Sequence, residues 1–395
     1  MKLLRIIPSI DPRGGGPMEG ARRIDAELIR LGHHVEVVCL DAPELLFNVN
    51  YPATVHALGP ALFGYRYSSS LVPWIRTHRH RFDAVLVNGL WQYHGFASWR
   101  ALAGTSTPYF VYVHGMLDPW FKRSYPLKHI KKWLYWPWAD YRLLRDAQSV
   151  LFTSEEELRQ APESFSLFRA NGKVAAYGTQ QPLQDVDGLL SSKFLSKHPE
   201  LRGKRLFLFL SRIHVKKGCD LLIDAFSTVA RNNPDLHLIM AGPDQTDLTA
   251  VLKRQAHAIG ISNRITWTGM LEGDEKWGAF HAAEVFCLPS HQENFGIVVA
   301  EALACGKPVL ISNKVNIWRE IEADGAGIVH EDTSQGTSFA LQRWLNLSDD
   351  ERCAMSQAAS SCFVGRFRID RVVQSLLSII SSAKNTQIEP LGVAQ

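Results

Sequence analysis

Four charged side chains stand just after predicted strands, where open α/β sheets bind their ligands. Arg212 and Lys217 follow one apolar, strand-length run, and Glu293 and Glu301 follow another. A guanidinium can hold two phosphate oxygens in a fork, and an ammonium adds a movable positive charge. Carboxylates do not suit phosphate, but each can accept two hydrogen bonds from a vicinal diol. The two pairs together favour a nucleoside diphosphate joined to a sugar.

Each pair also has a simpler interpretation, a solvated Arg/Lys loop and an exposed helix face. Repetition argues against the first, because the loop at Met270 also follows a predicted strand of the same half. Burial argues against the second, because the residues around Glu293 and Glu301 are mostly apolar. Backbone N–H groups of the intervening loop can serve the remaining hydroxyl or phosphate oxygens. The residues concerned are Asn294, Phe295, Gly296 and Ile297.

The stretch 285–312 is predicted to position both glutamates. Its apolar run 285–288 is a strand, 296–305 is a helix without an internal breaker, and 309–311 starts the next strand. A strand–helix–strand unit of this length is typical of a parallel crossover. The loop that carries Glu293 is therefore expected at the carboxyl end of a strand and at a helix N-terminus.

Strands and helices alternate along the whole chain, which predicts doubly wound α/β domains. The other expected strands are 3–10, 34–40, 82–87, 109–113, 147–152, 206–210, 236–241 and 265–269. The other expected helices are 18–31, 93–102, 220–229, 275–283, 338–345 and 352–382. The periodicity weakens between residues 173 and 199, so a domain boundary is expected there. Asp185 and Asp187 form a DxD pair in this linker, which we interpret as solvated surface because it does not follow a strand.

Two features of the amino-terminal half lie at ligand-facing positions. Gly14, Gly15 and Gly16 separate the first strand from the first helix, where an oxygen-rich ligand can approach the backbone closely. A plain tight turn explains these glycines as well. His114 follows the strand 109–113 and again faces the expected ligand edge. Alternatively, this histidine caps its loop through a backbone hydrogen bond.

The run 121–138 (FKRSYPLKHIKKWLYWPW) is basic and aromatic and has no acidic residue. Its cations are Lys122, Arg123, Lys128, Lys131 and Lys132. Basic residues interleaved with interfacial aromatics suit an anionic lipid headgroup or a lipid-diphosphate acceptor. A solvated helix whose aromatics pack inward fits the same letters.

The composition sets outer limits. With 395 residues, 46% hydrophobic and 21% charged, the chain can form two globular domains with proper cores. A net charge of +4 fits an anionic small molecule or a membrane surface and gives little support to nucleic acid. The six cysteines are scattered without a CxxC, which favours a reduced cytosolic protein without zinc. Neither a signal peptide nor a transmembrane run is apparent.

The segment Glu293–Glu301 resembles the E-x7-E signature of retaining family 4 glycosyltransferases with the GT-B fold. Residues 302–309 (ALACGKPV) continue the resemblance. Arg212 and Lys217 resemble the family's diphosphate-binding pair. Gly269 resembles the glycine before its base-binding loop, and Gly242 a glycine at a strand end.

The amino-terminal half resembles members of the family that build bacterial surface polysaccharides. The glycine loop, the segment 89–92 (GLWQ) that contains Trp91, and the segment 114–120 (HGMLDPW) carry this resemblance. Residues 176–179 (AYGT) depart from it, because the family more often has Pro-Asn-Gly there. The contact expected at this position is therefore not supported by the sequence.

The resemblance implies two Rossmann-like domains facing a central cleft. Residues 1–182 would bind the acceptor and residues 183–367 the nucleotide sugar. A helix at 368–384 would cross back to the first domain, and 385–395 would be a frayed tail. Gly15, Gly16, Gly242, Gly269 and Met270 are expected at the donor, together with Asn294, Phe295, Gly296, Ile297 and Glu301.

The implied reaction is retaining transfer of a hexosyl group from GDP-mannose or a UDP-hexose, without metal, other cofactor or protein nucleophile. Arg212 and Lys217 would stabilise the departing diphosphate, which itself could deprotonate the acceptor. His114 would contact the sugar near its 6-hydroxyl, Glu293 the 3- and 4-hydroxyls, and Glu301 the ribose.

The expected acceptor is a saccharide, in particular a polyprenyl-diphosphate-linked oligosaccharide of bacterial polysaccharide biosynthesis. The expected location is cytoplasmic and peripheral to the inner face of the plasma membrane, with Trp91 and the basic run on the acceptor side. Two alternatives remain, a nucleotide-sugar epimerase on the same fold and a non-catalytic sugar-nucleotide-binding protein. A dinucleotide dehydrogenase is disfavoured because neither half has a G-x-G-x-x-G sequence.

Overall fold

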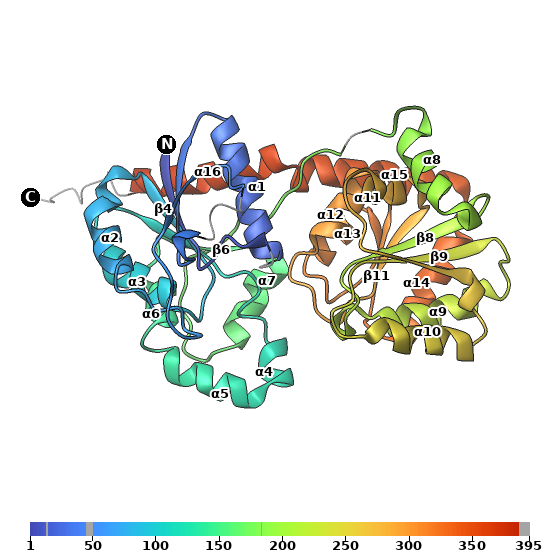
Figure 1. Cartoon of the computed structure of the whole chain (residues 1–395), viewed down its shortest axis with the longest axis horizontal. Helices are drawn as coiled ribbons and strands as arrows, with labels where there is room; N and C mark the ends of the chain where they lie inside the picture. Colours follow the sequence, from blue (N-terminus) through green and yellow to red (C-terminus); the bar gives the residue numbers. More distant parts are fainter. Residues whose placement is uncertain (13–14, 45–49, 183, 387–395) are drawn as a thin grey trace, which may run out of the picture. The chain divides into compact units, whose positions relative to one another are not determined.

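The computed structural model describes residues 1–12, 15–44, 50–182 and 184–386. Gly14, residue 183 and the expected tail beyond Thr386 lie outside the described residues. The chain divides into two compact units, Met1–Gly178 with Ile369–Gln395, and Thr179–Arg368 (Figure 1). The sequence places these divisions a few residues away, at 182/183 and 367/368.

Unit 1 is built on a seven-stranded sheet in the order β3-β2-β1-β4-β5-β6-β7. All its pairings are parallel. The strands are β1 Lys2–Ile6, β2 His34–Cys39, β3 Thr54–Ala57, β4 Ala84–Asn88, β5 Tyr109–Tyr112, β6 Ser149–Phe152 and β7 Gly172–Val174. The chain order reverses between β1 and β4, which makes this edge a topological switch point.

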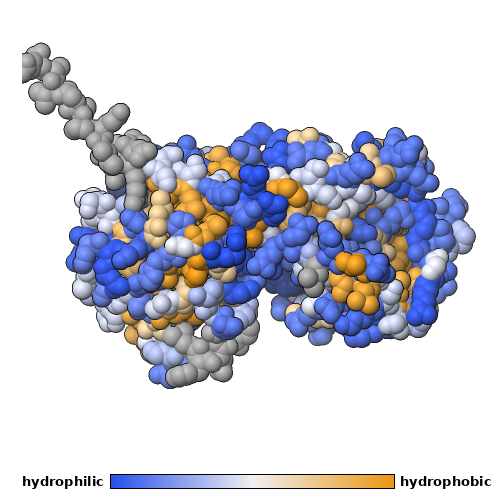
Figure 2. Space-filling model, turned by 90° about the horizontal axis from the view of Figure 1, so that it is seen from above, coloured by the Kyte–Doolittle hydropathy of each residue, from blue (hydrophilic) through white to orange (hydrophobic). Residues whose placement is uncertain are grey.

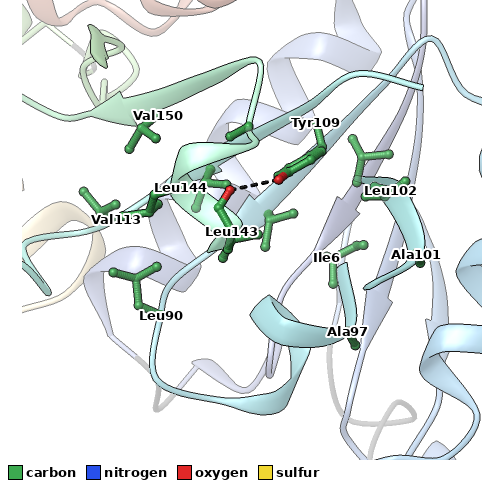
Figure 3. Close-up of a cluster of buried hydrophobic side chains, with 14 of the residues drawn as sticks. Ile6, Leu90, Ala97, Ala101, Leu102, Tyr109, Val113, Leu143, Leu144 and Val150 are labelled. Atoms are coloured by element: carbon green, nitrogen blue, oxygen red, sulfur yellow. Dashed lines mark hydrogen bonds between the residues drawn. The ribbon is translucent and has the colours of Figure 1, made fainter. Parts of the chain in front are cut away.

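Helices cover both faces of this sheet, so its central strands are buried on both sides and read as continuous apolar runs. The helices are α1 Gly16–Arg30, α2 Leu71–His78, α3 Tyr93–Leu102, α4 Trp120–Ser124, α5 Pro126–Tyr135, α6 Asp140–Arg145, α7 Glu155–Gln160 and α16 Ile369–Thr386. The hydrophobic core under α3 and α6 is drawn in Figure 3. There the buried Tyr109 hydroxyl donates to the backbone oxygen of Leu143 at 2.9 Å.

Unit 2 repeats this plan with six parallel strands in the order β10-β9-β8-β11-β12-β13. The strands are β8 Arg205–Leu210, β9 Leu236–Ala241, β10 Ile265–Gly269, β11 Val285–Leu288, β12 Val309–Ser312 and β13 Gly327–His330. The helices are α8 Leu189–Lys197, α9 Cys219–Ala230, α10 Leu248–Ala258, α11 Gly273–Ala282, α12 Ile297–Ala304, α13 Trp318–Ala323, α14 Ser334–Asn346 and α15 Asp349–Cys362. The predicted fold class, with two doubly wound α/β halves, is confirmed.

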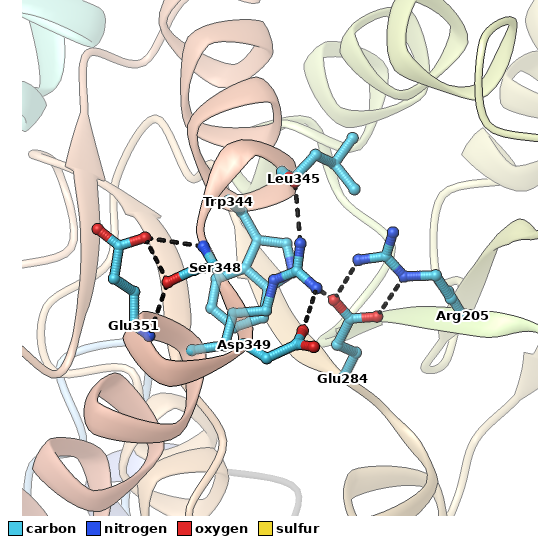
Figure 4. A network of polar contacts seen from close by, with 8 residues as sticks. Arg205, Glu284, Trp344, Leu345, Ser348, Asp349 and Glu351 are labelled. Carbon is cyan, nitrogen blue, oxygen red and sulfur yellow. Dashed lines mark hydrogen bonds and ion pairs between the residues drawn. The ribbon is translucent and has the colours of Figure 1, made fainter.

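A polar network ties the strands of unit 2 to its helices at the amino end of the sheet (Figure 4). Glu284, directly before β11, accepts two hydrogen bonds from Arg205 at 2.7 and 2.9 Å. The same carboxylate accepts the indole N–H of Trp344 in α14 at 2.9 Å. Ser348 and Glu351 form a capping box that starts α15. These contacts hold the end of the sheet opposite to the loops discussed below.

The predicted helix 352–382 is wrong as a single element. The helix α15 ends in a π-helical turn at Phe363–Phe367, where the N–H of Arg368 bonds to the carbonyl of Phe363 at 2.9 Å. Arg368 has extended backbone angles, and α16 begins at Ile369 in unit 1, where it packs on α1. The apolar periodicity continues across this break, because both helices bury one face, so the sequence does not reveal it.

The surface carries mixed polarity. On the face drawn in Figure 2, hydrophilic residues predominate and hydrophobic ones lie in small, separate groups. Among the helices of the described residues, none has the length and apolar character needed to cross a membrane.

Candidate functional site

The loops that follow β8, β9 and β10 are joined by backbone hydrogen bonds at the carboxyl edge of the sheet in unit 2. The N–H of Ile213 bonds to the carbonyl of Pro243 at 2.9 Å, and the N–H of Gly242 bonds to that of Gly269 at 2.7 Å. Gly242 has a φ of 136°, and a Cβ there would lie 1.8 Å from the carbonyl oxygen of Ser211. Only glycine permits this close approach.

The loop after β8 also contacts the loop after β11. Gly218 has a φ of 62°, and a Cβ there would lie 2.1 Å from the carbonyl oxygen of Pro289. The N–H of His291 bonds to the carbonyl of Lys216 at 2.8 Å. These contacts bring the side chains of Lys217 and Glu293 together, and the ammonium of Lys217 bonds to the carboxylate of Glu293. The sequence predicted both residues for one site but not their contact.

Glu293 is fixed through its backbone as well as its side chain. Its N–H bonds to the carbonyl of Lys314 at 2.9 Å, and its carbonyl accepts the N–H of Asn316 at 3.0 Å. Gly296, with a φ of 72°, caps the start of α12, so Ile297 is the first residue of that helix. The N-terminus of α12 therefore lies four residues after Glu293, one residue later than the predicted helix start at 296.

Three further residues were predicted to contact the donor, Asn294 and Phe295 in this loop and Met270 after β10. The side chain of Asn294 accepts a long hydrogen bond from Asn316 at 3.5 Å. Phe295 is buried and packs edge-on against Phe367, with 5.6 Å between ring centroids. The side chain of Phe295 thus anchors the loop in the core, and the contact predicted for this residue was through its backbone N–H. Met270, in contrast, is 61% exposed directly after Gly269.

Arg212 stands apart from the ion pair. Its side chain is exposed and makes no hydrogen bond or ion pair within the described part of the chain. Burial and the positive charges of Arg212, Lys216 and Lys217 lower the pKa of the neighbouring His214. The loop after β8 therefore carries a positive field, which suits an anionic ligand.

Glu301 has a partner that the sequence did not suggest. Its side chain is buried in α12, and the ammonium of Lys276 from α11 lies 3.0 Å from it. The same ammonium lies 4.2 Å from the ring centroid of Trp277. A buried carboxylate requires a nearby positive charge or hydrogen-bond donors. This requirement was the only indication in the sequence that Glu301 would have a cationic partner. No spacing rule pointed to Lys276.

His114 in unit 1 lies at the carboxyl end of β5 with a φ of 53°. Its ring packs beside those of Tyr112 and Tyr177, with 5.5 Å between ring centroids in each pair, and the two tyrosine rings lie 6.0 Å from each other. Nε2 lies 2.9 Å from the amide nitrogen of Asn88, and Nδ1 lies 2.6 Å from the hydroxyl of Tyr177. Burial lowers the pKa of His114 to about 3, so the ring is neutral. In the described part of the chain, the ring of His114 bonds to the side chains of Asn88 and Tyr177. The alternative, in which the ring caps its loop through a backbone hydrogen bond, is not observed there.

The other amino-terminal glycines lie at the start of α1. Gly15 is its N-cap, with a φ of 78°, and Gly16 is its first residue. Both are exposed, and a Cβ at either would meet no atom within 4 Å. The left-handed φ, and not crowding, therefore explains a glycine at position 15.

The basic run of unit 1 divides into two parts. The ammonium of Lys132 lies 4.3 Å from the ring centroid of Trp91 and 5.4 Å from that of Phe121. Burial lowers the pKa of Lys132. The backbone N–H of Trp91 bonds at 2.9 Å to Asp140, whose pKa is raised to about 7 by burial. Lys132 and Trp91, predicted for one acceptor region, are thus in contact.

The remaining basic residues, Lys122, Arg123, Lys128 and Lys131, are exposed. The run forms two helices, α4 and α5, and Pro126 is the first residue of the second. On α5, Leu127 is 81% exposed, Ile130 59% and Leu134 75%. Trp136 is fully buried. Trp136 therefore packs inward, whereas Trp138 is 66% exposed and a row of aliphatic side chains on α5 faces outward.

Asp185 of the DxD pair is not simply solvated, because its side chain caps the start of α8. Both carboxylate oxygens of Asp185 accept hydrogen bonds from the start of α8, including the N–H of Leu190 at 2.6 Å. Asp187 is exposed. Within the described residues, no group of three or more His, Cys, Asp or Glu side chains is placed to hold a metal ion.

Comparison with known families adds to this geometry. Residues 192–361 match the family described as "Glycosyl transferases group 1", and residues 15–178 match a "Glycosyl transferase 4-like domain". Together the two matches cover most of both units.

Curated relatives match about the length of one unit. The chain is 31% identical over 180 residues to a D-inositol 3-phosphate glycosyltransferase of Xylanimonas cellulosilytica, covering 45% of this chain and 42% of that protein. It is 31% identical over 189 residues to a mannosylfructose-phosphate synthase of Agrobacterium fabrum, covering 45% and 40%. A phosphatidyl-myo-inositol mannosyltransferase of Mycobacterium leprae is 33% identical over 143 residues, covering 36% of each. The chain thus aligns with less than half the length of these relatives.

Solved structures match nearly the whole chain. Anabaena Alr3699/HepE, solved in complex with UDP and glucose, has a TM-score of 0.72 at 21% identity and covers 97% of this chain and 100% of its own. WaaG, a glycosyltransferase involved in lipopolysaccharide biosynthesis, has a TM-score of 0.60 at 16% identity and covers 99% and 100%. At these identities the likeness establishes the fold.

Proposed function

Because the chain belongs to the family 4 glycosyltransferases with the GT-B fold, we propose that it transfers a hexosyl group from a nucleoside-diphosphate sugar to a saccharide acceptor, with retention at the anomeric carbon. The observation that carries this proposal is the cluster at the carboxyl edge of the sheet in unit 2. There Arg212, Lys217, Glu293 and Glu301 come from adjacent loops and helices, and the contact between Lys217 and Glu293 joins a phosphate-binding cation to a hydroxyl-binding carboxylate.

Arg212 and Lys217 bind the diphosphate in this proposal, and Glu293 binds hydroxyls of the transferred sugar. Lys217 and Glu293 neutralise one another in the absence of ligand. A bound diphosphate offers Lys217 a second anion, which frees carboxylate oxygens of Glu293 to accept sugar hydroxyls. Glu301, held by Lys276 at 3.0 Å, accepts the ribose hydroxyls. Gly242, Gly269, Met270 and the N-terminus of α12 supply backbone contacts to the donor.

The donor is GDP-mannose or a UDP-hexose. The UDP and glucose bound by the Anabaena neighbour and the mannosyl groups in the names of two relatives support this class. The transfer needs no metal and no other cofactor, because Arg212, Lys217 and backbone N–H groups stabilise the charge of the departing diphosphate. One such donor typically lowers the barrier by about 3 kcal/mol. An oxygen of the leaving diphosphate takes the proton of the acceptor hydroxyl on the same face, which retains the anomeric configuration.

His114 contacts the donor sugar near its 6-hydroxyl in this proposal, and Gly15 and Gly16 present backbone to the donor. Unit 1 also receives the acceptor. The ammonium of Lys132 lies 4.3 Å from the ring centroid of Trp91. This cation–π pair places a positive charge beside an aromatic face, which suits an anionic acceptor group.

The acceptor is a polyprenyl-diphosphate-linked oligosaccharide of bacterial polysaccharide biosynthesis, met at the cytoplasmic face of the plasma membrane. The outer face of α5 supports this part. Leu127, Ile130 and Leu134 form one exposed row, and Lys128 and Lys131 lie beside it without any acidic residue in 121–138. Such a face suits an anionic bilayer surface, into which the apolar row inserts while the ammonium groups meet lipid phosphates.

The donor proposal is tested with a panel of nucleotide sugars, scored by thermal shift and by transfer to saccharide acceptors. Arg212→Ala and Lys217→Ala are expected to lower turnover by about 10²–10³-fold. Arg202→Ala is the matched control, because this exposed arginine precedes β8 at the opposite edge of the sheet. Turnover that persists in both variants would contradict the proposal, and product formed without acceptor would favour an epimerase.

The membrane proposal is tested by co-sedimentation with vesicles of phosphatidylcholine alone or with phosphatidylglycerol. The intact protein is expected to bind the anionic vesicles more strongly, and the double variant Leu127→Asp/Leu134→Asp to lose this binding. Val251→Asp on α10 controls for a new charge at an exposed apolar position, since Val251 is 48% exposed. Equal binding by all three proteins, or equal binding to both vesicles, would exclude α5 as the docking face.

A further inference from the structure

A buried chain of side chains in unit 1 leads from Arg5 to His114. Arg5 is fully buried and pairs with Asp25, with a shortest contact of 2.6 Å. Its Nη1 donates to the side-chain oxygen of Asn88 at 2.7 Å. The side-chain nitrogen of Asn88 lies 2.9 Å from Nε2 of His114, and the hydroxyl of Tyr177 lies 2.6 Å from Nδ1 and 3.3 Å from Nε2. The route crosses from β1 to β4 and then to the end of β5.

The direction of each hydrogen bond follows from the chemistry of its groups. A guanidinium can only donate, so the oxygen of the Asn88 amide must face Arg5. The amide nitrogen then faces His114 and donates, so Nε2 of the ring must accept. A neutral imidazole that accepts at Nε2 carries its hydrogen on Nδ1. That hydrogen is directed to Tyr177, which has the shorter contact with Nδ1.

We propose that Asn88 is a positioning residue for His114: oriented by Arg5, its amide holds the ring as the neutral Nδ1–H tautomer, with the hydrogen directed to the hydroxyl of Tyr177. The functional consequence rests on the proposed role of His114 at the donor sugar. In this arrangement buried side chains engage both ring nitrogens of His114, Asn88 at Nε2 and Tyr177 at Nδ1, and so set the orientation of the ring.

Tyr177 stands where the sequence departs from the family pattern, and the structure gives it a different task. Its ring stacks on His114 and fills the space beside α1, where a Cβ on Gly20 would lie 2.8 Å from the ring. The ring of Tyr112 is nearly parallel to that of His114, at 5°, and lies 6.0 Å from the ring of Tyr177. The imidazole is therefore held by contacts with both aromatic rings and by hydrogen bonds at both of its nitrogens.

Two-bond ¹H–¹⁵N correlation spectra of protein with ¹⁵N-labelled histidine report the tautomer directly. The signals of His114 are identified because they are absent from the spectrum of the His114→Gln variant. The spectrum of the intact protein at neutral pH is expected to show a protonated Nδ1 and an unprotonated Nε2. A protonated Nε2 in the intact protein would overturn the proposal, and this measurement does not depend on any variant folding.

Asn88→Asp is the decisive variant. A carboxylate of the same shape can only accept, so Nε2 must become a donor. The spectrum is then expected to show a protonated Nε2, and turnover is expected to fall on the order of tenfold, as when partners that orient a functional histidine are changed. An unchanged tautomer in this variant would refute the role of Asn88. A changed tautomer with unchanged turnover would refute its role in positioning His114 for function.

Tyr112→Phe is the matched control. The Tyr112 hydroxyl is buried and has no hydrogen-bond partner among the described residues, although its ring stacks on His114 as that of Tyr177 does. The histidine spectrum and turnover are expected to stay unchanged in this variant, and a change of tautomer there would count against a hydrogen-bonded cause. If the intact protein shows the expected tautomer but transfers no sugar to any acceptor, the proposed function fails and the assignment of Asn88 stands.

Discussion

The ion pair of Arg5 and Asp25 provides a sharp test of how unit 1 is held together. Both side chains are fully buried. Three hydrogen bonds of 2.6–2.9 Å join them, and the hydroxyl of Tyr51 donates to the same carboxylate at 2.8 Å. Asp25→Asn keeps the shape of the side chain but removes its charge. The guanidinium then remains buried without a counter-charge.

The expected cost can be worked out in two ways. Breaking a buried pair by removing one partner typically costs about 3–5 kcal/mol. Coulomb's law gives about 4 kcal/mol for unit charges about 4 Å apart at an effective dielectric constant of about 20, which agrees. Unit 1 has about 200 residues, for which 1 kcal/mol shifts the Tm by roughly 2–4 °C. The transition of unit 1 is therefore expected to fall by roughly 6–20 °C.

Differential scanning calorimetry and urea unfolding measure this loss. Asp274→Asn is the control, because Asp274 and its partner Lys193 are about half exposed and such pairs contribute less than about 1 kcal/mol. A loss in Asp25→Asn no larger than that of the control would refute the reasoning, since it would mean that the buried guanidinium does not need the carboxylate.

Two further predictions concern the glycine at the sheet edge and the buried histidines. Gly242→Ala places a Cβ 1.8 Å from the carbonyl of Ser211 and should destabilise unit 2 by more than about 3 kcal/mol in urea unfolding. Gly260→Ala, at a φ of 77° with no atom within 4 Å, should cost only about 1 kcal/mol, and equal losses would contradict the steric argument. Burial lowers the pKa of His114 to about 3 and that of His94 to about 4. As the pH falls below about 6.5, the unfolded chain takes up protons that the folded chain does not, so each histidine should lower the stability by up to about 1.4 kcal/mol per pH unit. Urea unfolding of the intact protein at about pH 7 and about pH 5 measures this, and equal stability would show that these rings are not held neutral.

The three strands that were not predicted from the sequence all lie at the edges of the sheets. β3, β7 and β13 are three or four residues long, and β3 and β7 are only partly buried. Central strands such as β4 and β5 are buried along their whole length and therefore read as continuous apolar runs. Short edge strands gain their structure from one neighbour, so their sequences carry little of the pattern.

The sequence by itself determined the local arrangement of the candidate site. The spacing of Glu293 and Glu301, the glycine that caps α12 and the strand before it all follow from chain-local periodicity and turn chemistry. Only the tertiary structure decided the partners. Each contact joins residues that are far apart in the sequence. The separation is 76 residues for Lys217 and Glu293, 25 for Lys276 and Glu301, and 63 for Tyr177 and His114.

The physical reason lies in the order of the strands. β8 pairs with β11 because the chain reverses its direction of winding there, and this places the loops after both strands side by side. In unit 1 the same reversal sets β1 beside β4, so that Arg5 reaches Asn88. Periodicity tells which residues form strands and which face is buried. The choice of neighbouring strands depends on contacts between distant segments, so the ion pair at the candidate site and the tautomer inferred for His114 emerge only from the folded chain.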